Sequence, residues 1–126
     1  MRKENKEKAD LRLKDADEFI ASSKDNLTLG RFKASLDHAI DAVIAANDAF
    51  TIYFLEQVAS LDHREAISLH KLAGQKINEN KASEISEFLE ERHRKTYRTV
   101  SVNKDLAELM FKKATRFLIW VKNKIK

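Results

Sequence analysis

The residues best suited to chemistry lie in one short stretch near position 95. Four cations, one imidazole and one phenol occur within seven positions, at Arg92, His93, Arg94, Lys95, Tyr97 and Arg98. Guanidinium and ammonium groups bind phosphate oxygens, and a tyrosine ring stacks on a nucleic-acid base. The stretch therefore predicts a site for a nucleotide or an RNA phosphate.

The same stretch also has an interpretation as an ordinary solvated helix face. Glu87, Glu90 and Glu91 precede the cations by about one helical turn, which is the spacing of intrahelical ion pairs. Basic runs are common on protein surfaces. The spacing alone leaves both interpretations open.

Four histidines raise the question of a metal site, but no two have the i, i+4 spacing of a zinc-binding helix. His63 and His70 are seven residues apart and could share a helix face, without an identifiable acidic third ligand. His38 lies three residues before Asp41, so either a hydrogen bond between them or a half-buried structural role fits. We therefore predict no metal and no cofactor.

Other catalytic motifs are missing from the sequence. The chain has no cysteine, no serine framed by glycines, and two isolated glycines in place of a phosphate-binding glycine loop. Thiolate catalysis and P-loop chemistry are thereby excluded.

Length and composition predict one helical domain spanning residues 1–126. A chain of 126 residues fits a single domain, and 35% charged residues without any proline suit long amphipathic helices. No apolar run approaches the roughly 18 residues of a membrane span. The charged first eight residues precede no apolar segment, which indicates a cytoplasmic protein. The net charge of +4 permits a polyanionic partner without requiring one.

A long central helix from Gly30 to Ser60 is predicted to organise the chain, because its apolar residues recur at steps of three and four. That stripe comprises Phe32, Leu36, Ala39, Ile40, Val43, Ala46, Phe50 and Phe54. Further helices are predicted at 4–25, at 62–73, from 80 or 83 to 97, and from 101 or 103 onwards. The expected fold is an all-α, five-helix antiparallel up-and-down bundle with four long helices and one short one.

Helix ends can be predicted from capping residues. Candidate N-caps are Thr28 for the second helix, Asp62 with Glu65 for the third, Asn80 or Ser83 for the fourth, and Ser101 or Asn103 for the fifth. Gly74 is predicted to follow the third helix as its C′ residue. Residues 1–3 are predicted to fray.

Four segments together resemble the HEPN domain family of prokaryotes. They read FKASLDHAIDAVIAANDAF, HREAISLHKL, RHRKTYR and LAELMFKKATRFLIWVKNKI, and they span nearly the whole chain. Two patterns carry the resemblance best. One is Phe32–Ala34–His38–Ala39–Ala42–Ala46 in the central helix, and the other is Ala114–Phe117–Leu118–Val121 in the last helix.

This resemblance implies an all-α bundle that commonly forms a homodimer. It also implies relatives that are ribonuclease toxins paired with small nucleotidyltransferase antitoxins, and others that bind nucleotides or RNA. Ile52, Tyr53 and Trp120 lie near stripe edges and are weak indications of an exposed apolar face for a dimer.

The ribonuclease members carry an arginine followed, after four to six residues, by a histidine near the penultimate helix. Here Arg92 is followed at that spacing by Tyr97, and His93 is adjacent to Arg92. A phenol is a poor base near neutral pH. The pairs Arg31–His38 and Arg64–His70 meet the spacing formally but lie on earlier helices.

The leading hypothesis is therefore a HEPN-like protein that binds a nucleotide or RNA through Arg92, Arg94, Lys95 and Arg98 without catalysis. Tyr97 would stack on a base and His93 would assist. A metal-independent ribonuclease toxin using His93 across a dimer is the second hypothesis. A structural protein that docks an acidic partner, such as a nucleotidyltransferase, is the third.

Overall fold

The computed structural model describes residues 2–60, 62–97 and 101–125, with the side chains of residues 95–97 left out of the description. Within these ranges the chain forms five helices and one two-stranded sheet. The helices are α1 (Lys8–Thr28), α2 (Phe32–Leu55), α3 (His63–Gln75), α4 (Ala82–Tyr97) and α5 (Lys104–Lys124). The strands are β1 (Arg2–Lys3) and β2 (Gln57–Val58). The prediction of an all-α bundle with one short helix is confirmed.

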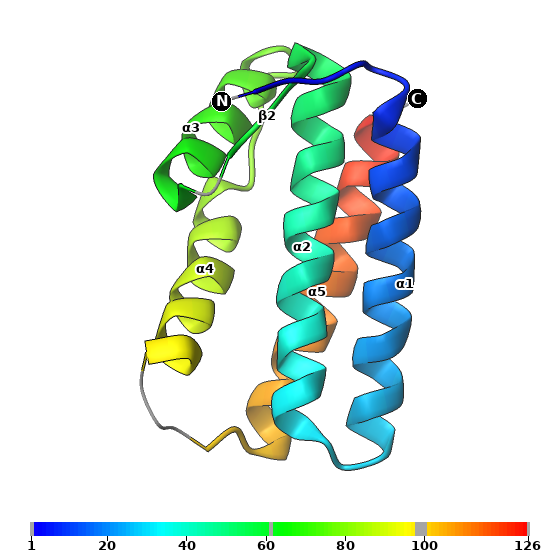
Figure 1. The fold of residues 1–126 in the computed structure, drawn as a ribbon, viewed down its shortest axis with the longest axis vertical. Coiled ribbons are helices and arrows are strands. Elements are labelled where there is room, and N and C mark those ends of the chain that lie inside the picture. Colours follow the sequence, from blue (N-terminus) through cyan, green and yellow to red (C-terminus); the bar gives the residue numbers. More distant parts are fainter. Residues whose placement is uncertain (1, 61, 98–100, 126) are drawn as a thin grey trace.

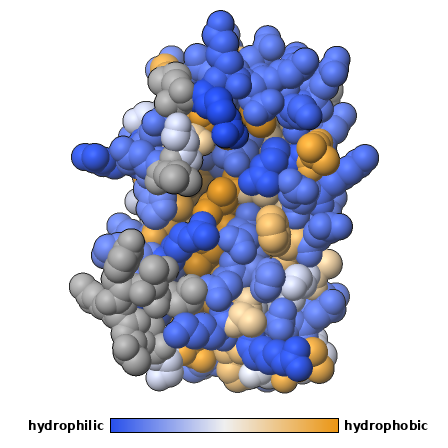
Figure 2. Space-filling view, viewed as in Figure 1, coloured by the Kyte–Doolittle hydropathy of each residue, from blue (hydrophilic) through white to orange (hydrophobic). Residues whose placement is uncertain are grey.

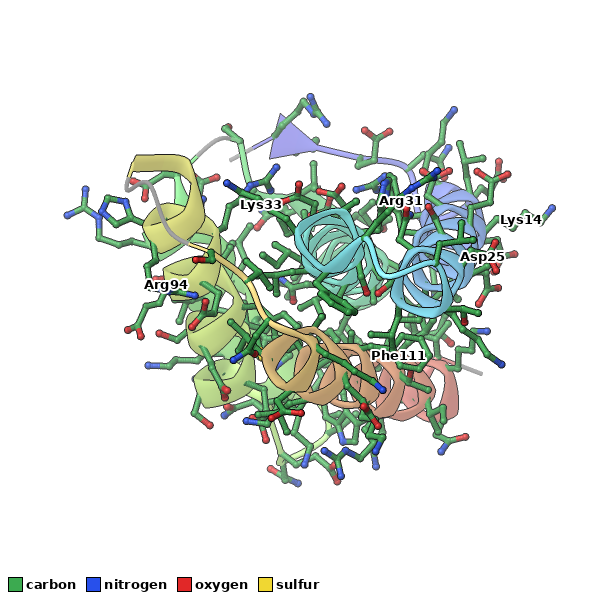
Figure 3. The ribbon with its side chains drawn as sticks, turned by 90° about the horizontal axis from the view of Figure 1, so that it is seen from below. Lys14, Asp25, Arg31, Lys33, Arg94 and Phe111 are labelled. Carbon is green, nitrogen blue, oxygen red and sulfur yellow. The ribbon has the colours of Figure 1, made fainter. Side chains whose placement is uncertain are left out.

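The four long helices alternate in direction around α2 (Figure 1). Helix α2 packs against α1, α5, α4 and α3. Seen along the helix axes in Figure 3, α2 lies between α1 and α4, while α5 covers a third side. Within the described residues, no helix combines the length and the apolar character needed to cross a membrane.

The core follows the predicted stripe of α2. Leu36, Ile40, Val43 and Phe50 are almost fully buried, and they pack with apolar residues of the other helices. Small residues widen this stripe: Ala39, Ala45, Ala46 and Ala49 are all completely buried. Because alanine leaves little side chain between helix axes, α1 and α5 can both approach α2 closely.

Two leucines of the helices lie outside the core. Leu72 of α3 and Leu109 of α5 are each 46% exposed, so not every apolar residue of these helices faces the interior. The expected exposed apolar face at Ile52, Tyr53 and Trp120 is wrong for Ile52, which is 2% exposed. Trp120 is half-buried, packs against Phe50, and donates its indole N–H to Glu79.

The prediction that the first residues fray is wrong for Arg2 and Lys3. They form β1 and pair antiparallel with Val58 and Gln57 of β2. Helix α2 ends at Leu55, earlier than predicted, because Glu56 adopts a left-handed conformation with φ 53° that ends the helical hydrogen bonding. Met1 lies outside the described residues.

The turn between α1 and α2 is a Schellman motif. The Gly30 N–H donates to Leu27 O at 3.2 Å, and the Arg31 N–H donates to Asn26 O at 2.8 Å. Gly30 has φ 76°, which glycine adopts without steric cost. The prediction that Thr28 caps α2 is wrong, since Thr28 is the last residue of α1 and its hydroxyl donates to Lys24 O.

Two predicted caps are confirmed. Asp62 accepts from the Arg64 N–H at 2.8 Å, and Asn103 accepts from the Leu106 N–H at 2.8 Å. Asn80 accepts from the Ala82 N–H at 3.0 Å, but it lies one residue before the position that flanks α4. Glu65, the other member of the predicted capping-box pair, accepts from the backbone N–H of Ser60 at 3.3 Å, two residues before the N-cap Asp62.

The prediction that Gly74 follows α3 as its C′ residue is wrong. This glycine lies inside α3, and helical residues follow it up to Gln75. A Cβ at this position would stand 2.5 Å from Glu79 O and 2.8 Å from Asn80 Cβ. Glycine is required here because the turn leading into α4 passes directly over the helix.

Candidate functional site

A groove between α2, α3 and α4 contains Arg92, one of the predicted site residues. Its volume is about 150 Å³. Figure 2 shows hydrophobic surface at the centre of this face, with hydrophilic side chains on both sides. The apolar lining residues are Ile44, Ala59, Ala66, Ile85 and Leu89; the polar ones are Asn47, Asp48, Ser60, Asp62, His63 and Arg92.

Arg92 reaches the groove because of the helical period of α4. Residues 85, 89 and 92 are spaced by four and three, so Ile85 and Leu89 share the face of Arg92. The guanidinium Nη2 lies 3.6 Å from Asp41 Oδ1 on α2, and both side chains are partly exposed. At that distance the two groups attract each other without a hydrogen bond.

Arg94 faces a different environment on the same helix. Its Nε donates to Glu91 Oε2 at 3.1 Å, and its Nη2 lies 3.0 Å from the same oxygen. This is the intrahelical ion pair of the solvated-face interpretation. The neighbouring Glu87 accepts from Lys113 of α5 at 2.6 Å, so it does not neutralise the α4 cluster.

The remaining predicted residues lie outside the groove or beyond the description. His93 is exposed on α4 and does not line the groove. Lys95 and Tyr97 belong to the last turn of α4, where side chains are not described, and Arg98 lies outside the described residues.

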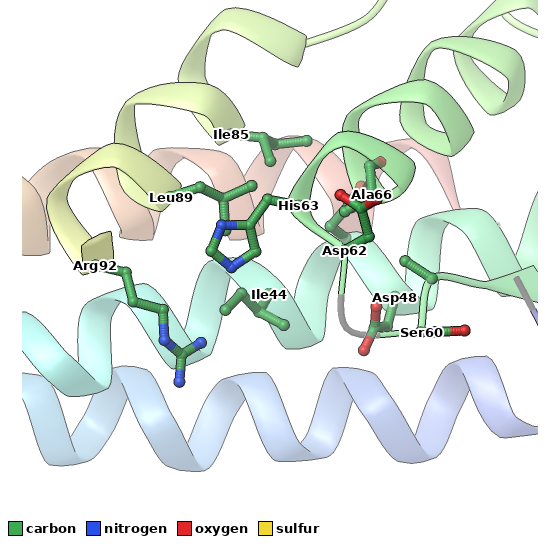
Figure 4. A pocket seen from close by; sticks show the side chains of 11 residues that line it. Ile44, Asp48, Ser60, Asp62, His63, Ala66, Ile85, Leu89 and Arg92 are labelled. Carbon is green, nitrogen blue, oxygen red and sulfur yellow. Dashed lines mark hydrogen bonds between the residues drawn. The ribbon is translucent and has the colours of Figure 1, made fainter. Parts of the chain in front are cut away.

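His63 is a groove residue that the sequence reasoning considered only as a metal ligand. The N-cap at Asp62 makes it the first residue of α3. Figure 4 shows its imidazole within the groove, beside Leu89 and Ile44 and on the side of Arg92. No local signal reveals this proximity, because His63 and Arg92 are 29 positions apart in the sequence.

His70 serves the core and cannot join His63 as a metal ligand. Its side chain is completely buried; Nδ1 lies 2.8 Å from Asn47 Oδ1, and Nε2 accepts from the Lys81 N–H at 2.8 Å. Since Nε2 accepts, Nδ1 carries the proton and donates to Asn47. Burial lowers the pKa of His70 to about 4. No group of three or more potential metal ligands occurs among the described residues.

The hydrogen bond between His38 and Asp41, one of the two interpretations left open by the sequence, does not form through Nδ1 of His38. This atom is buried and has no hydrogen-bond partner within the described part of the chain. The ring packs near Phe19, with 6.2 Å between centroids. The carboxylate of Asp41 instead approaches Arg92. His38 therefore has the structural role that was the alternative.

At the end of the groove away from Arg92 lies the carboxylate of Asp48, which is fixed by a hydrogen bond from Arg12. Arg12 of α1 donates to Asp48 Oδ2 at 3.0 Å and to Asp15 Oδ2 at 2.8 Å. Burial raises the pKa of Asp48, although the Arg12 charge opposes that shift. The groove thus has a cation at one end, a carboxylate at the other, and an apolar floor between them.

Comparison with known proteins adds no assignment. No protein-family model matches the chain, and no curated protein is significantly similar to it in sequence. The fold and the groove define an all-α helical bundle with a small, half-apolar cleft beside its fourth helix.

Proposed function

We propose that this HEPN-like protein binds the phosphate of a nucleotide or of single-stranded RNA at the α2–α3–α4 groove, with Arg92 as the central cation. The observation that carries the proposal is the position of Arg92. It stands over an apolar groove, and Asp41 approaches it only to 3.6 Å. A guanidinium has five N–H donors in a planar fork, which suits bidentate binding of phosphate.

The apolar floor supports a nucleotide over a simple inorganic anion. Ile44, Ile85 and Leu89 offer a surface against which a base can pack. A site of this composition is typical of small-ligand clefts, which combine apolar walls with a few placed polar groups. Arg94, Lys95 and Arg98 would strengthen the positive potential along the end of α4, and Tyr97 would offer a second stacking surface.

A metal-independent ribonuclease is the second candidate, favoured by the presence of His63 in the same groove as Arg92. RNA cleavage of this kind needs a base for the 2′-hydroxyl proton and a cation for the charge on phosphorus. Imidazole changes its charge near neutral pH and suits the first task. The candidate pair is therefore Arg92 with His63, in place of His93.

Substitution of Arg92 by glutamine is expected to weaken binding of a labelled single-stranded RNA. Loss of one phosphate contact should reduce the slope of log affinity against log salt concentration by about 0.7. The measurement is a fluorescence titration at several salt concentrations. Arg116→Gln is the matched control, because Arg116 is an exposed arginine of α5 outside this groove. Equal losses in both variants would mean that only the net charge matters.

Incubation of RNA with the protein in EDTA separates the two candidates. If the ribonuclease candidate is correct, cleavage will be seen and will fall at least about 100-fold in His63→Ala, as expected for the loss of a general base. His93→Ala serves as the control and should retain cleavage. Cleavage that depends on His93 instead would overturn the role of His63. Salt-sensitive binding without cleavage would leave the binding function alone.

A further inference from the structure

The groove has the size of a single aromatic ring. Its volume is about 150 Å³. An apolar protein cavity of about that volume holds benzene. A pyrimidine is one six-membered ring, whereas a purine has two fused rings. The groove is partly open, so a pyrimidine ring matches its inner space more closely than a purine does, and the rest of a nucleotide would extend out of it.

The walls of the groove suit a flat ring with two apolar faces. Ile44 projects from α2 and Leu89 from α4, and Figure 4 shows the His63 imidazole between them; Ile85 and Ala66 also line the groove. The side-chain amide of Asn47 also lines the groove, but both of its polar atoms already have hydrogen-bond partners within the protein. Its Oδ1 bonds with His70 Nδ1, and its Nδ2 donates to Ala66 O at 3.5 Å.

The carboxylate of Asp48 supplies an acceptor at the end of the groove. Asp48 lies one helical turn after Ile44, and its side chain is 18% exposed. One bond from Arg12 occupies part of Oδ2. An ionised carboxylate has about four lone-pair sites, so acceptor capacity remains. Carboxylates accept from the exocyclic amine of cytosine, which makes cytosine the best complement.

The distance between the two ends of the groove, at Arg92 and at Asp48, matches the length of a whole nucleotide. It is longer than a base alone. Asp41, which marks the position of Arg92, and Asp48 are seven residues apart on α2. At 1.5 Å per residue, this separation is about 10 Å along the helix. A base at Asp48 and a phosphate at Arg92 would leave room for one sugar between them.

We infer that the groove is a pyrimidine-nucleotide site, with cytosine packed on Ile44 beside the His63 imidazole, its amine at Asp48 and its phosphate at Arg92. This inference rests on the proposed function and specifies its ligand. The base can come from a free nucleotide or from an unpaired position in RNA, because both present the same ring and phosphate.

Calorimetric titration with CMP, UMP, AMP and phenyl phosphate tests the inference. CMP is expected to bind about tenfold more tightly than AMP, since a purine exceeds the groove, and about tenfold more tightly than phenyl phosphate, which lacks the amine. Equal affinities for CMP and AMP would overturn the inference. Phenyl phosphate binding as tightly as CMP would overturn the role of Asp48.

Two variants keep the test independent of folding defects. Ala66→Leu fills the groove and should remove the preference for CMP over AMP while leaving binding of inorganic phosphate unchanged. Asp48→Asn should reduce the preference for CMP over UMP, with circular dichroism as the folding control. If both variants keep the wild-type preferences, the base lies elsewhere and the inference fails.

Binding of oligocytidylate and of oligoadenylate of equal length is measured next. The comparison shows whether the ligand is a free nucleotide or RNA, and whether the pyrimidine site fails alone or together with the proposed function. A preference for oligocytidylate together with weak CMP binding identifies RNA as the source, and tight CMP binding identifies the free nucleotide. Equal, salt-sensitive binding of both oligomers would overturn the pyrimidine site and leave the proposed function intact. Binding of neither the oligomers nor CMP would overturn both.

Discussion

The substitution Phe50→Ala is expected to lower the free energy of unfolding by about 3–5 kcal/mol, the largest effect of any substitution considered. Phe50 is completely buried in the C-terminal part of α2. Its ring centroid lies 5.0 Å from that of Phe54, 4.8 Å from His70 and 5.1 Å from Trp120. Truncation would leave a cavity where α2, α3 and α5 meet, and these helices are too tightly packed to collapse into it.

Denaturant unfolding, followed by circular dichroism, measures this loss. Phe111→Ala is the matched control because it removes the same atoms from a half-buried position on α5 (Phe111 is labelled in Figure 3). Its cost should be about 1–2 kcal/mol, in proportion to the smaller area buried. If the two variants lost the same free energy, Phe50 would not be the centre of the core.

The fold was predictable from the sequence because helix packing depends on a local period. The three- and four-residue spacing of apolar residues that includes Phe50 specifies which face of α2 is buried, whatever lies against it. The pairing of β1 with β2 was not predictable. It joins residues 2–3 to residues 57–58, and Glu56 must take a left-handed conformation that non-glycine residues rarely adopt.

The candidate site was predictable only in part, for a geometric reason. Arg92 and Arg94 are two positions apart, which separates them by about 200° around a helix. One therefore reaches the groove, and the other pairs with Glu91 on its own helix. A cluster of cations along the chain is not a cluster in space. His63 was missed because its proximity to Arg92 depends on how α3 packs against α4.

The start of α4 is held to the core through polar contacts that the sequence did not reveal. Helix α4 packs against α2 and α3, and grooves lie on both sides of it. At its N-terminal end, the Lys81 N–H donates to buried His70. Just before it, Glu79 accepts from the indole of Trp120 at 2.7 Å and pairs with Lys124 at 3.1 Å. The position of one wall of the groove thus depends on a neutral histidine.

The stability of the protein is expected to fall by about 2 kcal/mol between pH 7 and pH 5 through His70 alone. The pKa of His70 is about 4 in the folded protein, below its ordinary value of 6.5, because burial disfavours the imidazolium. The nearby Glu84 opposes this shift only weakly. The unfolded chain therefore takes up the proton first as the pH falls. Stability is full above pH 6.5, and it is lost progressively down to pH 4.

The variant His70→Gln isolates this contribution in denaturant titrations at several pH values. Glutamine can still accept from the Lys81 N–H but cannot be protonated in this range. The variant should be less stable than the wild type at pH 7, because the bond to Asn47 and the ring packing on Phe50 are lost. Its stability should nevertheless change little between pH 7 and pH 5, so the difference from the wild type should narrow by about 2 kcal/mol. Parallel pH profiles for the two proteins would mean that His70 is protonated in the folded state without cost. The bond from Lys81 would then not be what holds α4 against the core.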